Sequence, residues 1–297
     1  MGMTGVSTLK ARAALLVVGL LVTLLVLALS ACGGAGGSEG EEAAGAEGKL
    51  ARVVEIEGER GLYVKCTGSG SPTVVMEAGD EMDNSHYINV ESAVAQKTRT
   101  CLYDRAGLGR SDPAPPPPRQ LPDLVGDLEK LLDDAEIPGP YVLVGASGGG
   151  YIITGYAVEH PDRVAGMVFV DTPAPWLVVD APQEIVKYTD PDRPGNVEHR
   201  DFLQVEQDAW EARRRIGNIP VRIITADYPD YYIEEQPYPE WRKDMRHNVE
   251  GQEDWLVLSP QAKQIVVDTG HEVMEEEPEV VIEAIVEVLR EARRKPS

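Results

Sequence analysis

The feature that most constrains this chain is the alternation, from Arg52 onward, of short β-branched runs with longer amphipathic stretches. This alternation is typical of strand–helix–strand units that build a mainly parallel sheet. The later runs are nearly all apolar, as expected of strands that helices cover on both faces. The sequence therefore predicts an α/β domain with eight strands, at residues 52–56, 62–66, 73–77, 99–103, 141–144, 166–170, 221–225 and 264–267.

Two of the longer stretches have the spacing of packing helices. Residues 119–134 and 278–293 repeat Leu, Val and Ile at helical intervals. A third stretch, residues 172–219, separates the sixth and seventh strands and is rich in charged and aromatic side chains. A connection of this length predicts a lid, in which Trp176 and Tyr188 are candidates for lining a substrate pocket.

A G-x-S-x-G motif, Gly145 to Gly149, directly follows the strand at 141–144 and precedes a helical stretch. A sharp strand-to-helix turn needs glycines because its central residue is strained and neighbouring segments pass close to it. The motif alone is weak in a chain with 29 glycines. Its position after a buried strand makes Ser147 a candidate nucleophile.

Three further runs carry a family resemblance, which extends over residues 53–289. The sequence resembles α/β-hydrolases in DRAGLGRSD (104–112), PYVLVGASGGG (140–150) and PDRVAGMVFVD (161–171). It departs from many relatives at Ala146 and at residues 77–79. The resemblance implies an α/β-hydrolase fold: an eight-stranded mostly parallel sheet, helices on both faces and a helical lid between strands 6 and 7.

A serine hydroxyl needs a general base, which a carboxylate orients. Of the five histidines, His271 lies after the last strand in DTGHEVMEEEP, which resembles the histidine loop of the family and completes the order serine, acid, histidine. The acid is Asp171, at the end of the sixth strand, or Asp227, after the seventh. We favour Asp171 and keep Asp227 as the alternative.

The resemblance also implies an oxyanion hole formed by the backbone N–H groups of Gly148 and Asp80. The loop of Asp80 also carries Glu81 and Asp83. Carboxylates beside a developing oxyanion oppose it unless they point away or pair with a substrate cation. The sequence offers one hypothesis, that this acidic rim selects neutral or cationic substrates.

These residues together predict a serine hydrolase that forms an acyl-enzyme on Ser147 and needs no cofactor. A small-molecule carboxylic ester is the first expectation for the substrate, and an amide, as in aminopeptidases related to proline iminopeptidase, is the nearest enzymatic alternative. A haloperoxidase-like activity shares the same residues. From another class, a non-catalytic binding lipoprotein of the same fold remains a rival interpretation.

The N-terminal segment has the pattern of a secretory signal. Lys10 and Arg12 precede an apolar run at 13–29 that is short for a membrane span. The ending Leu-Ser-Ala-Cys resembles the lipobox of bacterial lipoproteins, which predicts a signal peptide at 1–31 and a lipid anchor on Cys32, outside the cytoplasm. An uncleaved transmembrane helix is the alternative. Residues 32–49 then form a Gly/Ala/Glu tether, and 50–297 form the hydrolase domain.

The two other cysteines, Cys66 and Cys101, are expected to form a disulfide in such a compartment; two buried free thiols are the alternative. No metal-ligand spacing is present, so no metal site is predicted. The net charge of −22 makes nucleic acid a poor partner, since binding phosphates requires clustered Lys and Arg.

Overall fold

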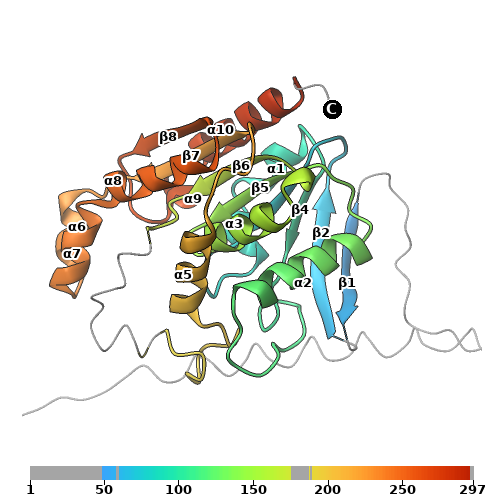
Figure 1. Ribbon diagram of the computed structural model, residues 1–297, viewed down its shortest axis with the longest axis horizontal. Helices are drawn as coiled ribbons and strands as arrows, with labels where there is room; N and C mark the ends of the chain where they lie inside the picture. The colour runs from blue at the N-terminus through green and yellow to red at the C-terminus, as the bar shows by residue number, and fades with distance from the viewer. Residues whose placement is uncertain (1–48, 58–59, 175–186, 188, 295–297) are drawn as a thin grey trace, which may run out of the picture. The chain divides into compact units, whose positions relative to one another are not determined.

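The computed structural model describes residues 49–57, 60–174, 187 and 189–294. The signal segment, Cys32, most of the tether, Trp176 and Tyr188 lie outside the described residues. The described part contains an eight-stranded sheet, as predicted (Figure 1). Its strands are β1 (Leu50–Glu57), β2 (Arg60–Thr67), β3 (Thr73–Glu77), β4 (Thr100–Tyr103), β5 (Tyr141–Ala146), β6 (Val164–Val170), β7 (Pro220–Ala226) and β8 (Gln261–Val267).

The strands follow the order β1-β2-β4-β3-β5-β6-β7-β8. β2 is antiparallel to both β1 and β4, whereas all pairs from β4 to β8 are parallel. Parallel strands end at the same edge of a sheet. The loops that leave β3, β5, β6, β7 and β8 therefore meet at one edge, which is where the candidate site residues were predicted.

Helices cover both faces of the sheet, which explains why the central strands are apolar throughout. α2 (Leu121–Asp134), α3 (Gly149–Glu159) and α5 (Phe202–Ala212) pack on one face, and α1 (Glu91–Ala95) and α10 (Pro278–Ala292) on the other (Figure 1). Successive side chains of a strand point to opposite faces. In β5, Leu143 accordingly joins the core beneath α2 and α3, while Val142 and Val144 join the core beneath α10.

The start of α2 shows how the local sequence sets a boundary. Gln120 and Asp123 form a capping box, and Pro122 lies in the first turn, where its missing N–H costs no helical hydrogen bond. One face of this helix then buries Leu124, Leu128 and other apolar residues. The predicted helix at 119–134 is thus present and begins two residues later.

The remaining short elements lie mostly in the connections around the site edge. Within the described part of segment 172–219, α5 is the helix that the structure contains. A second group of short helices lies between β7 and β8. The sequence did not mark this segment as part of a lid. The short elements are η1 (Asn84–Tyr87), η2 (Pro161–Arg163), α6 (Asp230–Glu235), α7 (Pro239–Met245), α8 (Asn248–Gln252), η4 (Glu253–Leu258) and α9 (Val273–Glu276).

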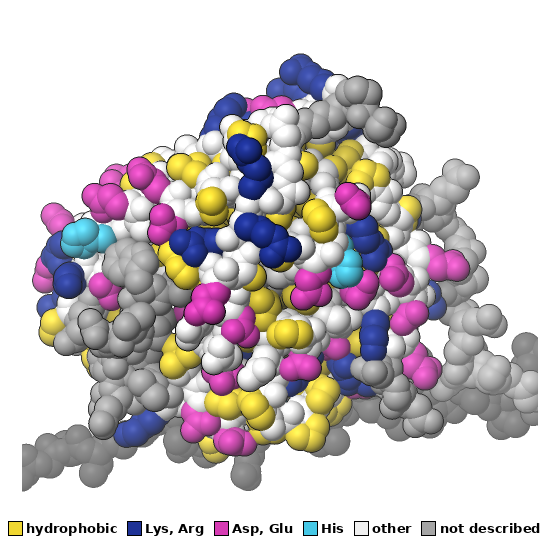
Figure 2. Space-filling model, viewed as in Figure 1, with side chains coloured by type: hydrophobic (Ala, Val, Ile, Leu, Met, Phe, Trp, Pro, Cys, Tyr) yellow, Lys and Arg dark blue, Asp and Glu magenta, His cyan; other side chains and the backbone are white. Residues whose placement is uncertain are grey.

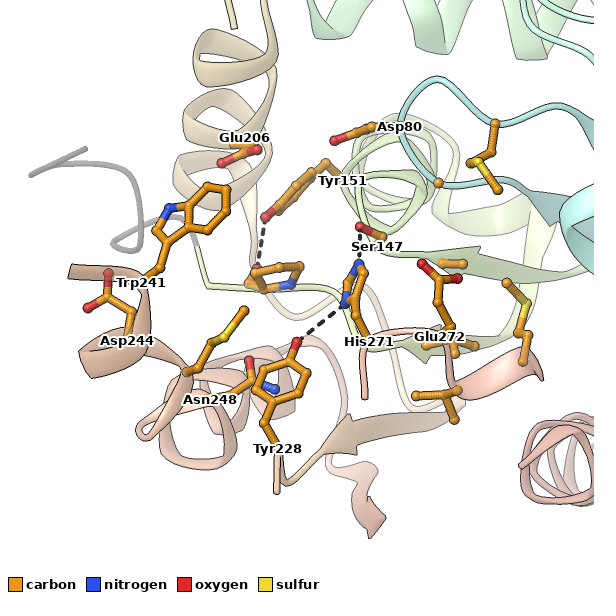
Figure 3. A pocket seen from close by; sticks show the side chains of 18 of the residues that line it. Asp80, Ser147, Tyr151, Glu206, Tyr228, Trp241, Asp244, Asn248, His271 and Glu272 are labelled. Atoms are coloured by element: carbon orange, nitrogen blue, oxygen red, sulfur yellow. Dashed lines mark hydrogen bonds between the residues drawn. The ribbon is translucent and has the colours of Figure 1, made fainter. Parts of the chain in front are cut away.

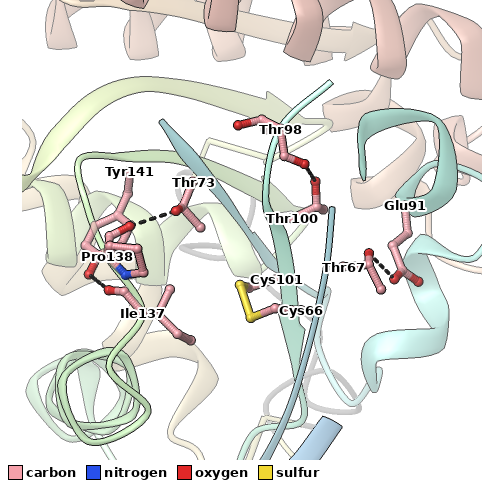
Figure 4. The surroundings of a disulfide bond; sticks show 10 residues. All are labelled: Cys66, Thr67, Thr73, Glu91, Thr98, Thr100, Cys101, Ile137, Pro138 and Tyr141. Atoms are coloured by element: carbon pink, nitrogen blue, oxygen red, sulfur yellow. Dashed lines mark hydrogen bonds between the residues drawn. A yellow bond between two sulfur atoms is a disulfide. The ribbon is translucent and has the colours of Figure 1, made fainter. Parts of the chain in front are cut away.

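A disulfide joins Cys66 of β2 to Cys101 of β4, as expected (Figure 4). The two residues are direct partners in the antiparallel ladder, and both are buried. Closing a loop of this length stabilises a fold by about 3 to 4 kcal/mol. The bond therefore ties the antiparallel end of the sheet to its parallel part.

No described helix is long and apolar enough to cross a membrane. On the face shown in Figure 2, acidic side chains are dispersed among basic and apolar ones.

Candidate active site

Ser147 occupies the turn between β5 and α3 with a backbone φ of 47°. This is the left-handed region, which costs a non-glycine residue free energy and is found where the surrounding structure imposes it. Glycine is required on both sides: a Cβ on Gly149 would lie 2.5 Å from the carbonyl oxygens of Glu77 and Ala78, and one on Gly145 would lie 2.8 Å from Gly150. The turn presents the Ser147 hydroxyl at the sheet edge.

His271, in the loop after β8, connects Ser147 to Asp171. Its Nε2 lies 2.9 Å from Ser147 Oγ (Figure 3). Its Nδ1 lies 2.6 Å from Asp171 Oδ2. Since a carboxylate only accepts hydrogen bonds, Nδ1 carries the proton and Nε2 is free to accept one. This is the arrangement of a nucleophile, its base and the acid that orients the base.

Asp171 is fully buried at the end of β6, yet it is surrounded by hydrogen-bond donors. Burial alone would raise the pKa of this carboxyl, but the hydrogen bond and charge of His271 and the neighbouring donors hold it below the ordinary value of 3.8. Asp171 is therefore ionised at neutral pH. Besides His271, the donors are the N–H of Ala226 at 3.0 Å, the Tyr228 hydroxyl at 2.5 Å, Asn248 Nδ2 at 2.9 Å and Gln252 Nε2 at 2.7 Å.

The alternative acid, Asp227, does not reach this site. Its side chain is exposed, and its N–H donates to the carbonyl of Val267. The next residue, Tyr228, points inward instead, and its hydroxyl also lies 3.3 Å from His271 Nδ1. Sequence reasoning missed Tyr228, because its place next to Asp227 marks it as inward only once Asp227 is known to face outward, and the sequence left that open.

The pKa of His271 reflects two opposing causes. Burial lowers it, while the hydrogen bond and charge of Asp171 raise it, with the net result above the ordinary 6.5. Of the other histidines, His86 lies beside the site and its Nδ1 accepts the Gly79 N–H at 3.2 Å. His199 Nδ1 lies 2.6 Å from the Pro115 carbonyl, and His160 is 3.4 Å from Glu129. His247 Nδ1 is 2.8 Å from the Lys243 carbonyl.

The expected oxyanion donors, Gly148 and Asp80, lie against each other beside Ser147. A Cβ on Gly148 would overlap the Asp80 carboxylate, and one on Gly79 would lie 3.5 Å from Ser147 Cβ. None of the hydrogen bonds found among the described residues uses the N–H of Gly148 or of Asp80. Both groups are thus available to a ligand at Ser147.

Comparison with known proteins supports the fold that carries these residues. A family model described as alpha/beta hydrolase fold matches residues 78–223. A thermophilic esterase from Thermogutta terrifontis superposes with a TM-score of 0.64 and 20% identity, covering 82% of this chain and 99% of that one. The chain has the α/β-hydrolase fold.

Curated relatives include hydrolases and proteins without an assigned role. The uncharacterised protein YqjL of Bacillus subtilis (strain 168) is 25% identical over 226 residues, covering 74% of this chain and 85% of YqjL. A 2-hydroxy-6-oxononadienedioate/2-hydroxy-6-oxononatrienedioate hydrolase of Paraburkholderia xenovorans (strain LB400) is 32% identical over 145 residues, covering 47% of this chain and 50% of that enzyme. The chain spans as little as 18% of the length of other curated relatives it matches.

In this α/β-hydrolase fold the acidic loop after β3 is not a free acidic rim. Asp80 pairs with Arg200 Nη1 at 2.5 Å, and Glu81 pairs with Arg193 Nη2 at 2.5 Å. Asp83 accepts the N–H of Ser85 and caps η1. Arginines from the segment before α5 thus offset the loop's charge, so Glu81 and Asp83 no longer support a selective rim.

Arg105, from the DRAGLGRSD run, also fixes the loop after β3 through buried hydrogen bonds. Its Nη1 donates to Glu77 Oε1 at 2.6 Å and to the Ala78 carbonyl at 2.8 Å, and its Nη2 donates to the Gly79 carbonyl at 2.7 Å. Its Nε donates to Glu198 at 2.5 Å. The departure from the family at Glu77 therefore has a structural reason, because a buried carboxylate is needed to partner this buried guanidinium.

A cavity of about 500 Å³ opens beside Ser147 and His271. Its walls are mostly apolar and aromatic, as in small-molecule sites. Among the described lining residues, four are acidic and none is Lys or Arg. The acidic ones are Asp80, Glu206, Asp244 and Glu272; the apolar and aromatic ones include Met82, Tyr151, Phe202, Tyr228, Tyr232, Trp241 and Met245.

Proposed function

We propose that this protein is a serine hydrolase that cleaves a carboxylic ester through an acyl-enzyme on Ser147. The observation that carries the proposal is the continuous relay of hydrogen bonds from Ser147 Oγ through His271 to Asp171. His271 Nε2 removes the hydroxyl proton as Oγ attacks the ester carbonyl, and the N–H groups of Gly148 and Asp80 stabilise the oxyanion. Each such donor contributes about 3 kcal/mol to transition-state stabilisation.

Collapse of the tetrahedral intermediate breaks the bond to the alkoxy group, which leaves as the alcohol with the proton from His271. Water then enters, gives a proton to His271 Nε2 and attacks the acyl carbonyl. The carboxylic acid departs, and Ser147 regains its proton. Ionised Asp171 stabilises the imidazolium in both half-reactions.

A fluorophosphonate probe, which reacts with activated serines, tests the proposal directly. We expect the wild-type chain to be labelled, and Ser147→Ala and His271→Ala to lose labelling. Ser92→Ala, an exposed serine on α1, is the matched control and should label as wild type. Absence of labelling in a wild-type chain with a native circular dichroism spectrum would contradict the proposal and favour a binding protein of the same fold.

We also propose that the chain is exported and anchored through a lipid on Cys32. The Cys66–Cys101 disulfide supports an oxidising compartment. Expression in a bacterium fed an alkyne fatty acid should label the wild type and not Cys32→Ser. Equal labelling of both, or of neither, would contradict the anchor.

A further inference from the structure

The carboxyl of Glu206 lies in the cavity but has no role in the proposed reaction. Glu206, on α5, lines the same cavity as Ser147 and His271. In Figure 3 its carboxyl faces that of Asp80, on the far side of Tyr151 from the base. Among the described residues it has no hydrogen bond or ion pair, because Arg200 directs its Nη1 to Asp80.

The charged and titratable groups around Glu206 come from three elements. Asp80 lies on the loop after β3, Arg200 precedes α5, and Tyr151 belongs to α3. Burial and the charge of Asp80 raise the pKa of Glu206 to about 8, and Arg200 offsets only part of this. Glu206 is therefore mainly uncharged at neutral pH, and a neutral carboxyl both donates and accepts hydrogen bonds.

We propose that Glu206 determines the substrate's charge class: it binds a neutral polar group, such as an amide or hydroxyl, at the α5 end of the cavity and excludes substrates that carry a carboxylate there. This inference rests on the proposed ester hydrolysis at Ser147. An anion in that position would face Asp80 and would find no Lys or Arg among the described lining residues. A buried charge without a partner is strongly unfavourable.

The same geometry predicts how the selection changes with pH. Below about pH 8 the Glu206 carboxyl holds its proton, so an anionic substrate is repelled only by the part of the Asp80 charge that Arg200 does not offset. Above it, Glu206 adds a second negative charge close to the bound group. Like charges in a partly buried site repel each other, so discrimination against carboxylates should increase as Glu206 ionises.

Two 4-nitrophenyl esters with acyl chains of equal length, one ending in a primary amide and one in a carboxylate, test this on the full chain. The ratio of their kcat/KM values cancels the ionisation of His271, which affects both equally. Between pH 6.5 and pH 9 we expect the amide preference of the wild type to increase by up to about tenfold, because pH 9 lies about one unit above the pKa of Glu206. In Glu206→Gln, which cannot ionise, the ratio should stay constant.

Glu211→Gln is the matched control, since it removes a carboxylate from the exposed side of the same helix. It should retain the wild-type pH dependence. A ratio that rises equally in Glu206→Gln would overturn the inference while leaving ester hydrolysis intact. If the esters are poor acyl donors, phosphonate probes with the same two termini give the ratio from Ser147 labelling rates. Failure of all probes on the folded wild type would instead overturn the proposed function.

Discussion

Asp171 and Glu206 are two carboxyls at one cavity with opposite behaviour. Asp171 has lost all contact with solvent, yet its pKa is lowered. Glu206 retains some exposure toward the cavity, yet its pKa is raised to about 8. The difference lies in the donors: Asp171 has five, from four different parts of the chain, and Glu206 has none among the described residues. Burial makes the ionised form of a carboxyl less favourable, and hydrogen-bond donors determine whether the carboxyl stays ionised in spite of it.

The two regions around these carboxyls differ in construction as well. The end of β6 is fixed by its pairing with β5 and β7, and one donor from β7 and two from α8 converge on Asp171 there. The region around Asp80 and Glu206 is assembled from loops and from two helices, α3 and α5, and the buried Arg105 and Arg200 hold its loops in place. The following predictions test this contrast, from the largest expected effect to the smallest.

Asp171→Asn should reduce kcat by about 10³- to 10⁴-fold, because the amide no longer fixes the Nδ1–H tautomer of His271 or stabilises the imidazolium. The carboxylate also raises the pKa of His271, and a base acts only when neutral. The acid limb of the kcat/KM profile should therefore move to lower pH in the variant. Asp227→Asn is the control, and an equal loss there would contradict the assignment of the acid.

Arg105→Met should lower the free energy of unfolding by about 3 to 5 kcal/mol, since it leaves Glu77 and Glu198 buried without their partner. Urea denaturation monitored by tryptophan fluorescence measures it. Arg290→Met, an exposed arginine on α10, should change stability little. If both variants were equally stable, the contacts of Arg105 would not stabilise the loop after β3.

Tyr228→Phe removes one of the five donors to Asp171 and keeps the ring in its packed position. A hydrogen bond to a charged group contributes about 1.5 to 3 kcal/mol, so kcat/KM should fall about tenfold. The neighbouring exposed Tyr231→Phe serves as the comparison. An unchanged kcat/KM in Tyr228→Phe would show that the remaining donors are sufficient.

Glu206→Gln should change the pH dependence of stability. Because the folded-state pKa is raised, the stability that the protonated carboxyl supports is complete below its ordinary value of 4.5 and is lost as pH rises toward about 8. The variant should therefore gain stability relative to the wild type by roughly 1 kcal/mol for each unit that the pH rises between pH 5 and pH 8. Thermal unfolding at both pH values measures this; a stability difference that is the same at both would refute the raised pKa.

Much of the fold and the centre of the site followed from local sequence. The eight strands are present within a few residues of the predicted ranges. This agreement is expected because a short apolar run bounded by polar turns is itself the local signal of a buried strand. The turn at Ser147 was also predictable, since glycines at fixed offsets mark a tight backbone. Asp171 was favoured over Asp227, but the sequence left the alternative open.

Only the tertiary structure decided which side chains surround these residues. Tyr228, Asn248 and Gln252 reach Asp171 from segments 57 to 81 residues away along the chain. Arg105 and Arg200 have no local pattern that marks them as buried, because an arginine is buried only where carboxylates from other segments meet it. The sequence by itself determined the strands, the glycine-flanked turn at Ser147 and the order of the candidate site residues. The pairing of charges, and with it the pKa values of the carboxyls at the cavity, depends on long-range contacts that no local period encodes.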